Sequence, residues 1–271
     1  MNTRHGSEFA ASCLLPYAFS LLPATHGFAD ATFKETFEHG SNEGGWSYGT
    51  GQGFIEGSGG NPGAYFHDPM VDTFAPQPST VFGVNSLFTG NYRSRKVFSI
   101  GINLITHAVD FSADERPLTI MLVSDNGTPG NFNDDWAAYY MGAANIPLPG
   151  QGWISYEFDI PSQETMLPAG WNTLAFGPNS PPNPDWKDVI TDVTQLRFFY
   201  GDPTLFFIFQ VWNVGLDNPS ISLETPPVPA LAERALRATA LLLILAGVAV
   251  FSGPAALDSF DPIGHIARLR K

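Results

Sequence analysis

Cysteine is almost missing from this chain of 271 residues: Cys13 is the only one, and it lies near the N-terminus. No disulfide can form within the chain, so the fold must depend on its hydrophobic core. The sequence also has no P-loop and no G-x-S-x-G elbow. His39, His67 and His107 lack the H-x-H or H-E-x-x-H spacing of a transition-metal site. We therefore expect a protein that is not an enzyme.

Basic residues are also scarce. Residues 30–225 contain seven lysines and arginines against 22 aspartates and glutamates, which leaves a net charge of −15. Such a surface repels nucleic acid and anionic lipid headgroups, so we expect no nucleic-acid partner. A strongly acidic surface suits a secreted protein that holds divalent cations, although solubility alone explains it equally well.

Short segments of strand-forming residues, bounded by Gly, Pro, Asn or Asp, fill residues 30–225. The predicted strands are 32–38, 53–56, 64–67, 81–88, 97–105, 118–124, 137–141, 153–160, 174–176, 196–200, 205–212 and 220–224. Only residues 186–190 have a helical pattern. Many short strands with turn signals between them predict an all-β domain over 30–225, a β-sandwich of the jelly-roll type.

Hydrophobic alternation indicates which faces of these strands are buried. The two clearest apolar faces consist of Phe98, Ile100, Ile102 and Leu104, and of Ile154, Tyr156, Phe158 and Ile160. The runs 118–123 and 205–212 are apolar on both faces, which predicts two central strands.

The first 29 residues have the pattern of a secretory signal peptide. Arg4 precedes an apolar run, Phe9–Leu22, and the small residues Gly27 and Ala29 fit a cleavage site. Removal of this segment would leave a mature chain without cysteine. The alternative is a first strand of the domain, which would require the leucines of this run to enter a core.

The other end of the chain has three parts. Residues 226–234 form a proline-rich spacer, 235–251 a nearly pure apolar segment, and 252–271 a short tail with three basic residues at its end. The apolar segment reaches the lower end of the roughly 17 to 25 residues that span a bilayer. We expect a single apolar helix that anchors the protein in a membrane at least transiently. A buried core helix is the alternative.

The start of this region carries a resemblance. Val228, Pro229 and Glu233, followed by a Leu- and Ala-rich segment that contains Gly247, resemble the C-terminal sorting signals of the PEP-CTERM and IPTL-CTERM type. The resemblance implies export to the cell surface, outer membrane or extracellular matrix of a Gram-negative bacterium, with an exosortase-type enzyme as a partner. The chain departs from the pattern because Pro-Glu-Pro is absent and the basic residues do not follow the apolar segment directly.

A second resemblance covers most of residues 30–224. The motifs are Phe37-Glu38, Gly44-Gly45-Trp46, 59–63, 88–92, Asn103-Leu104 and Gly152-Trp153. They resemble the laminin B (domain IV) module in its bacterial form. This resemblance implies a non-catalytic extracellular adhesion or matrix module, and we expect it to recognise or scaffold extracellular polysaccharide.

The end of the domain, Gly215-Leu-Asp-Asn218 followed by Ile221, resembles the last strand of galactose-binding-like jelly rolls. In that fold a structural calcium ion joins the first strand to the last, and the matching positions here are Glu38 and Asp217. Nearby backbone carbonyl groups could complete the six to eight oxygen ligands that calcium requires. The alternative is a hydrogen bond between the terminal strands without any metal.

Aromatic side chains next to predicted loops are candidates for sugar binding, because their rings stack on sugar faces. These candidates are Trp136, Tyr139, Tyr140, Trp171 and Trp186. Sandwich cores also contain many aromatic residues, so burial is the alternative for the three tryptophans among them. We expect Trp46, Trp153 and Trp212 in the core.

One pair of carboxylates supports a competing hypothesis. Glu157 and Asp159 share a strand face about 6 to 7 Å apart, which resembles the acidic strand of laminarinase-type jelly-roll glycosidases. A carbohydrate-active enzyme that uses these two acids is the alternative function. Ser162 occupies the position of the third acid.

Overall fold

The computed structural model describes residues 29–225, apart from 83–86, 114–115 and 182–183. The predicted signal peptide, spacer, apolar helix and basic tail lie outside the described residues, as do Val228, Pro229, Glu233 and Gly247. Within the part that is described, no helix is long and apolar enough to cross a membrane.

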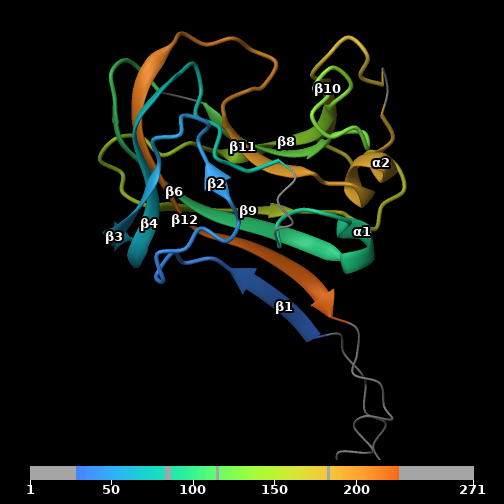
Figure 1. The fold of residues 1–271 in the computed structure, drawn as a ribbon, viewed down its shortest axis with the longest axis horizontal. Coiled ribbons are helices and arrows are strands. Elements are labelled where there is room, and N and C mark those ends of the chain that lie inside the picture. The colour runs from blue at the N-terminus through green and yellow to red at the C-terminus, as the bar shows by residue number, and fades with distance from the viewer. Residues whose placement is uncertain (1–28, 83–86, 114–115, 182–183, 226–271) are drawn as a thin grey trace, which may run out of the picture.

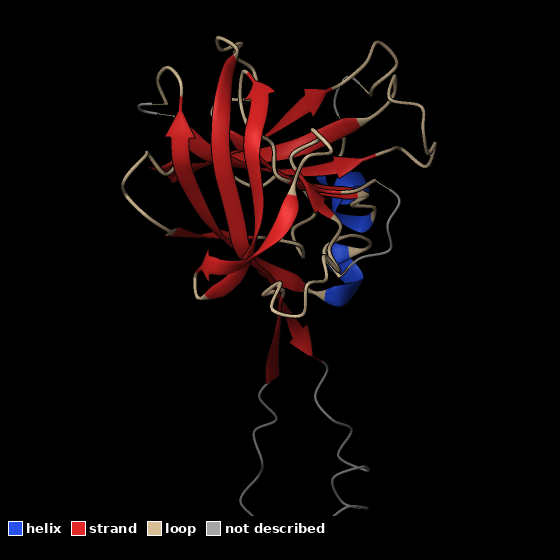
Figure 2. Ribbon diagram, turned by 60° about the vertical axis from the view of Figure 1, so that its left-hand side comes forward, coloured by secondary structure: helices blue, strands red, loops and turns tan. Residues whose placement is uncertain are grey.

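Two antiparallel sheets face each other, as Figures 1 and 2 show. The first sheet has the order β3-β4-β12-β6-β9, with β1 also paired to β12, and its strands are β1 (Ala29–Lys34), β3 (Phe54–Gly60), β4 (Gly63–Thr73), β6 (Val97–Val109), β9 (Ile154–Asp159) and β12 (Gln210–Thr225). The second has the order β10-β8-β7-β11-β5-β2, and its strands are β2 (Trp46–Ser47), β5 (Ser79–Thr80), β7 (Pro117–Ser124), β8 (Trp136–Asn145), β10 (Trp171–Ala175) and β11 (Gln195–Tyr200). The prediction of an all-β sandwich is confirmed.

The core lies between the sheets and follows the predicted alternation except at Phe98, which was expected on the inner face but is 37% exposed, whereas its neighbour Val97 is buried. On β6, Ile100, Ile102 and Leu104 are buried, and on β9 the buried side chains are Tyr156 and Phe158. Strand β7 is buried along nearly its whole length on both faces, as expected of a strand inside the sheet order. Burial of these apolar faces is the main stabilising contribution available to a domain without disulfides.

Three expectations about secondary structure are wrong. Residues 205–209 form a loop, and the strand β12 begins only at Gln210 and continues to Thr225. The described residues of 81–88 are not in a strand, because β5 ends at Thr80. The short helix α1 (Tyr92–Arg95) was not expected; the Asn91 side chain caps it by accepting a hydrogen bond from the Ser94 backbone N–H.

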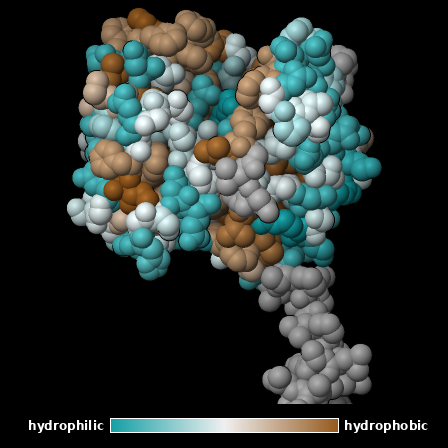
Figure 3. Space-filling view, viewed as in Figure 1, coloured by the Kyte–Doolittle hydropathy of each residue, from teal (hydrophilic) through white to brown (hydrophobic). Residues whose placement is uncertain are grey.

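The exposed apolar side chains of 205–209 lie at one end of the sandwich. Leu205, Phe206, Ile208 and Phe209 are all exposed, and Figure 3 shows apolar side chains gathered at the end where the β11–β12 loop lies in Figure 1. A run that is apolar at every position cannot by its pattern alone separate a buried strand from an exposed loop. The helix expected near residue 186 is confirmed as α2 (Trp186–Thr191).

Candidate functional site

A groove of about 780 Å³ lies at one edge of the sandwich. It runs between β9, which is the edge strand of the first sheet, and the strands β8 and β10 at the edge of the second. The connection between β9 and β10 closes one side. Its lining consists of Tyr140, Gly142, Ala143, Ala144, Ser155, Tyr156, Glu157, Phe158, Asp159, Pro161, Glu164, Met166, Leu167, Pro168, Ala169 and Trp171.

The alternation of β9 sets the polar side of the groove. Tyr156 and Phe158 point into the core, whereas Ser155, Glu157 and Asp159 are exposed. The Tyr156 hydroxyl donates a hydrogen bond of 2.7 Å to the Asn145 carbonyl, which ties β9 to the end of β8 across the two sheets. The predicted pair of carboxylates therefore lines the groove, as the alternation requires.

Glu157 is held in place by its neighbour on β6. The Ser99 hydroxyl donates a hydrogen bond of 2.7 Å to Glu157 Oε1. Ser99 pairs with Asp159, two residues along β9, so Ser99 and Glu157 are diagonal neighbours on the same face of the sheet. A carboxylate fixed in this way keeps its second oxygen available as an acceptor. It can therefore accept a hydrogen bond from a ligand hydroxyl without first reorganising.

Two aromatic rings form the other wall. Tyr140 lies 5.8 Å from Trp171, measured between ring centroids, and Trp171 lies 4.9 Å from Trp186. Gly170, which precedes Trp171, has a φ of +84°, and a Cβ there would lie 2.9 Å from Tyr140 Cε2. Glycine is thus required both by the backbone conformation and by the close approach of the Tyr140 ring.

Most of the predicted sugar-stacking rings are buried, so the prediction is wrong for them. Trp136 and Trp186 are 1% and 0% exposed, and Tyr139 is also buried. Their ring faces pack in the core and cannot stack on a ligand. Of these five, only Tyr140, which is half-buried, and Trp171, which is 6% exposed, line the groove. The sequence could not separate these cases, because aromatic residues serve both purposes in a sandwich.

The three tryptophans expected in the core differ in how deeply they are buried. Trp46 and Trp212 are buried, as expected. Trp153 is only partly buried; it lies edge-on to Tyr65 with ring centroids 5.2 Å apart, and its Nε1 donates a hydrogen bond of 2.8 Å to the Gly59 carbonyl. It therefore covers the outer face of the first sheet.

The segment after β9 supplies a carboxylate that the sequence reasoning missed. Ser162 is buried, but Glu164 lines the groove together with Met166, which is 77% exposed. Side chains from the two short helices hold this segment. Trp186 Nε1, on α2, donates a hydrogen bond to the Pro161 carbonyl, and Arg93 Nη1, on α1, donates one of 3.1 Å to the Glu164 carbonyl. Strand alternation could not reveal Glu164, because it follows the end of the strand.

The predicted calcium ligands meet at the turn between β3 and β4. The Asp217 carboxylate accepts hydrogen bonds from the Asn61 N–H at 2.6 Å and the Asn218 N–H at 2.7 Å. Glu38 accepts one from the Ala64 N–H at 3.2 Å. Asp217 is completely buried, and burial, with a smaller contribution from the nearby Glu38, raises the pKa of Asp217 to about 6. The two carboxylates are thus brought together, as the resemblance implies.

The residues around Glu38 and Asp217 meet some of the requirements of a site for a hard divalent cation. Two carboxylates close to one another favour a cation that neutralises them. Among the described residues, however, no group of three or more His, Cys, Asp or Glu side chains could hold a metal ion. Backbone carbonyl oxygens would have to supply the remaining ligands, and the Asn61 carbonyl is already hydrogen-bonded by the Asn218 side chain.

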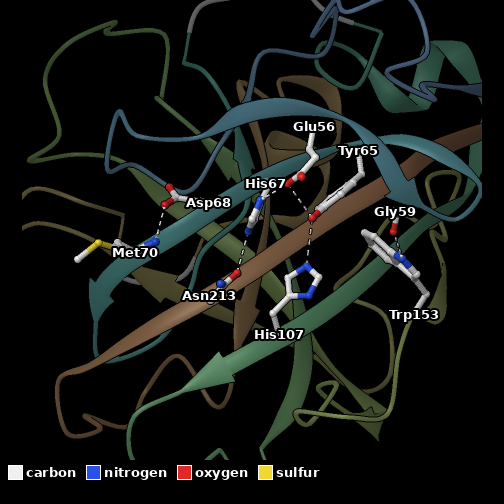
Figure 4. A network of polar contacts seen from close by, with 9 residues as sticks. All are labelled: Glu56, Gly59, Tyr65, His67, Asp68, Met70, His107, Trp153 and Asn213. Atoms are coloured by element: carbon white, nitrogen blue, oxygen red, sulfur yellow. Dashed lines mark hydrogen bonds and ion pairs between the residues drawn. The ribbon is translucent and has the colours of Figure 1, made fainter.

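A second polar cluster, shown in Figure 4, lies on the outer face of the first sheet. His67 Nδ1 lies 2.6 Å from Glu56 Oε2, and His67 Nε2 lies 2.8 Å from Asn213 Oδ1. The Tyr65 hydroxyl donates to Glu56 Oε2 and contacts His107 Nε2, both at 3.2 Å. Its members come from β3, β4, β6 and β12, which are neighbours in the sheet. The cluster links these four strands.

Charges in this cluster influence one another. The hydrogen bond from His67 lowers the pKa of Glu56. Burial, together with the neighbouring His67, lowers the pKa of His107. Burial and the Glu56 charge raise the pKa of Tyr65 to about 12. The sequence did not indicate that His67 and His107 meet, whereas their ring centroids are 5.2 Å apart.

Comparison with known proteins yields weak structural similarity only. No protein-family model and no curated protein matches the chain. An exo-β-agarase structure aligns with a TM-score of 0.37 at 12% identity, over 72% of this chain and 25% of that one. SGBP-B from a complex xyloglucan utilization locus in Bacteroides uniformis aligns with a TM-score of 0.26 at 11% identity, over 66% and 47%. The chain thus spans a quarter to a half of these proteins, and similarity at this level does not separate binding from catalysis.

Proposed function

We propose that the protein is an exported, non-catalytic jelly-roll protein of the laminin B-like type that binds extracellular polysaccharide through the groove between β9, β8 and β10. The observation that supports this proposal is the combination of surfaces in one groove. Tyr140 offers apolar ring surface on one side, with the largely buried Trp171 behind it, and Glu157, Asp159 and Glu164 offer acceptors on the other.

This combination suits sugars for a physical reason. A sugar ring presents C–H groups on its faces, which pack on aromatic rings, and hydroxyls at its rim, which donate to carboxylates. Three carboxylates in one groove repel an anionic chain. The preferred ligand is therefore a neutral polysaccharide.

Two variants test the groove against a matched control. Tyr140→Ala removes the partly exposed ring, and Glu157→Gln removes a charged acceptor while the side-chain length is kept. Each should weaken binding of the full chain to neutral polysaccharides in a pull-down by roughly fivefold or more, as expected for loss of about 1 kcal/mol or more. Phe206→Ala, an exposed aromatic at the β11–β12 loop, should leave binding unchanged. Equal binding by all three variants and the wild type would refute the proposal.

The proposed cell-surface location depends on the terminal sequences. A signal peptide at 1–29 and a sorting segment at 226–251 would bring the domain to the outside of a Gram-negative cell, with membrane attachment and exosortase-type processing. Mass spectrometry of the protein recovered from its own cells gives both mature termini. Recovery of an intact chain that begins at Met1 would contradict export.

Glycoside hydrolysis is a second candidate function, because Glu164 adds a third carboxylate to the groove that already holds Glu157 and Asp159. Hydrolysis needs one carboxyl group as an acid and another as a nucleophile or base. A reducing-end assay with neutral polysaccharides separates the candidates. Reducing ends that the wild type produces and that Glu157→Gln does not produce, even at polysaccharide concentrations that saturate the variant, would establish the enzyme. Binding without any new reducing ends supports the non-catalytic function.

A further inference from the structure

Arg197 lies on β11 in an unusual electrostatic setting. Its Nη1 donates a hydrogen bond of 3.0 Å to Gln77 Oε1, and its Nη2 donates one of 2.6 Å to Gln195 Oε1. Its Cζ lies 5.4 Å from the centre of the Phe176 ring. Two amide groups and one aromatic ring therefore fix the guanidinium, and none of them neutralises its charge.

The Arg197 side chain is half-buried and has no counter-ion. Among the described residues, no carboxylate oxygen lies within ion-pair distance of it, and its Nε is buried without a hydrogen-bond acceptor. Burial lowers the pKa of Arg197 to about 10, and only the more distant Asp135 opposes this shift. A buried charge that lacks a partner destabilises a fold. An arrangement that costs stability and is nevertheless built with two positioning amides indicates a binding role.

The space next to Arg197 can accept a ligand group. A pocket of about 370 Å³ is lined by Tyr48, Gly49, Thr73, Ala75, Gln77, Ser79, Phe82, Gln195 and Arg197. This lining contains no Asp or Glu, although the domain as a whole is strongly acidic. Gln195 is itself held by a hydrogen bond of 2.7 Å from its Nε2 to the Thr80 carbonyl. The pocket thus offers one cation and two amides that hydrogen bonds hold in place, together with the hydroxyl groups of Tyr48, Thr73 and Ser79.

We propose that this pocket binds the carboxylate or sulfate group of an acidic sugar, with Arg197 as the charged donor and Gln77 and Gln195 as positioning residues. The planar guanidinium suits both oxyanions, because its N–H groups form a fork that matches two oxygens. The pocket is separate from the groove: in the order β10-β8-β7-β11-β5-β2 the groove lies at β10 and β8, whereas Arg197 lies near the β5 and β2 edge.

The test compares two sugars that differ in one group. The full chain is titrated by NMR with glucuronate and with glucose, which share the ring and differ at C6, and glucose 6-sulfate distinguishes the two anions. The wild type should bind at least one of the acidic sugars at least tenfold more tightly than glucose. Arg197→Gln should lose this preference, and Lys187→Gln, which removes one positive charge on α2, should keep it.

Additional variants keep the result interpretable. Gln77→Ala leaves Arg197 in place but removes one of its tethers, so it should weaken the acidic sugar while glucose binding stays the same. Tyr140→Ala should keep the preference for the acidic sugar, which shows that the binding takes place in the pocket and not in the groove. The proposal rests on the proposed function only in the choice of sugars as probes. No preference in the wild type, a preference retained in Arg197→Gln, or loss of the preference in Tyr140→Ala would each overturn the proposal.

Discussion

The buried carboxylate Asp217 makes the stability of the domain depend on pH in a direction that can be measured. Its pKa is raised from the ordinary 3.8 to about 6, mainly by burial and further by Glu38. Between pH 3.8 and pH 6, Asp217 therefore keeps a proton in the folded state that it has released in the unfolded state. Stability from this group is fully present below pH 3.8 and is lost as the pH rises through 6. A shift of about 2 pKa units corresponds to about 3 kcal/mol.

Urea unfolding at pH 4 and at pH 7.5 measures this loss. Glu35, Asp135 and Asp192 also have pKa values raised by burial, so the wild type alone cannot assign the effect. Asp217→Asn removes the titration. Between pH 4 and pH 7.5 the free energy of unfolding should therefore fall by about 2.5 kcal/mol less in this variant than in the wild type, slightly below the full value because the unfolded carboxyl is partly protonated at pH 4. Asp159→Asn removes an exposed carboxylate and should behave like the wild type.

The absolute stability of Asp217→Asn is a separate matter. Two backbone N–H groups donate to the two Asp217 oxygens, and an amide can accept only one of them while its NH₂ group faces the other. The variant should therefore be less stable than the wild type at pH 4, by about 1 to 3 kcal/mol. An identical change with pH in the variant and the wild type would refute the reasoning about Asp217.

Calcium binding would act on the same carboxylates. A divalent cation that binds between Asp217 and Glu38 favours their charged forms. Added calcium at pH 7.5 should raise the melting temperature of the wild type, EDTA should reverse the effect, and neither should act on Asp217→Asn. A melting temperature that is the same in calcium and in EDTA would refute calcium binding between Asp217 and Glu38.

Three further perturbations test other parts of the structure. Trp186→Ala removes a completely buried ring and should cost about 3 to 5 kcal/mol in urea unfolding. Phe206→Ser acts on a side chain that is 77% exposed. Its free energy of unfolding, again measured by urea unfolding, should therefore differ from that of the wild type by less than about 0.5 kcal/mol. The pKa of His107 is lowered mainly by burial, so the unfolded state gains the proton first as the pH falls below 6.5. The wild type should therefore lose stability relative to His107→Gln in that range, in paired urea titrations.

Strand alternation predicted the inner faces of the sandwich well. The period of two along β9, and along β6 from Ile100 onward, fixed which side chains point into the core, because successive residues of a strand point to opposite faces. At the start of β6 it failed, because Val97 is buried and Phe98 is exposed. The same rule placed Glu157 and Asp159 on one side. Alternation failed at residues 205–209, where every position is apolar and the chain forms an exposed loop.

Contacts between distant strands were beyond sequence reasoning. His67 and His107 meet only because β4 and β6 both pair with β12, at opposite sides of it. Arg197 and Gln77 meet because β11 pairs with β5. Neither pairing leaves a mark in the spacing of the residues along the chain. Resemblance to a fold did predict one distant pair, Glu38 and Asp217, since it supplied the strand order that spacing lacks.

The two proposed sites carry opposite charge, and this limits which ligands can occupy both. The groove holds three carboxylates and the pocket one guanidinium, on a domain whose net charge is −15. A densely charged polyanion would meet repulsion over most of this surface and attraction only at Arg197. A mostly neutral chain with occasional acidic residues fits both sites. Since salt screens exposed charges, added salt should strengthen the binding of a dense polyanion but weaken the contact of a single acidic residue with Arg197.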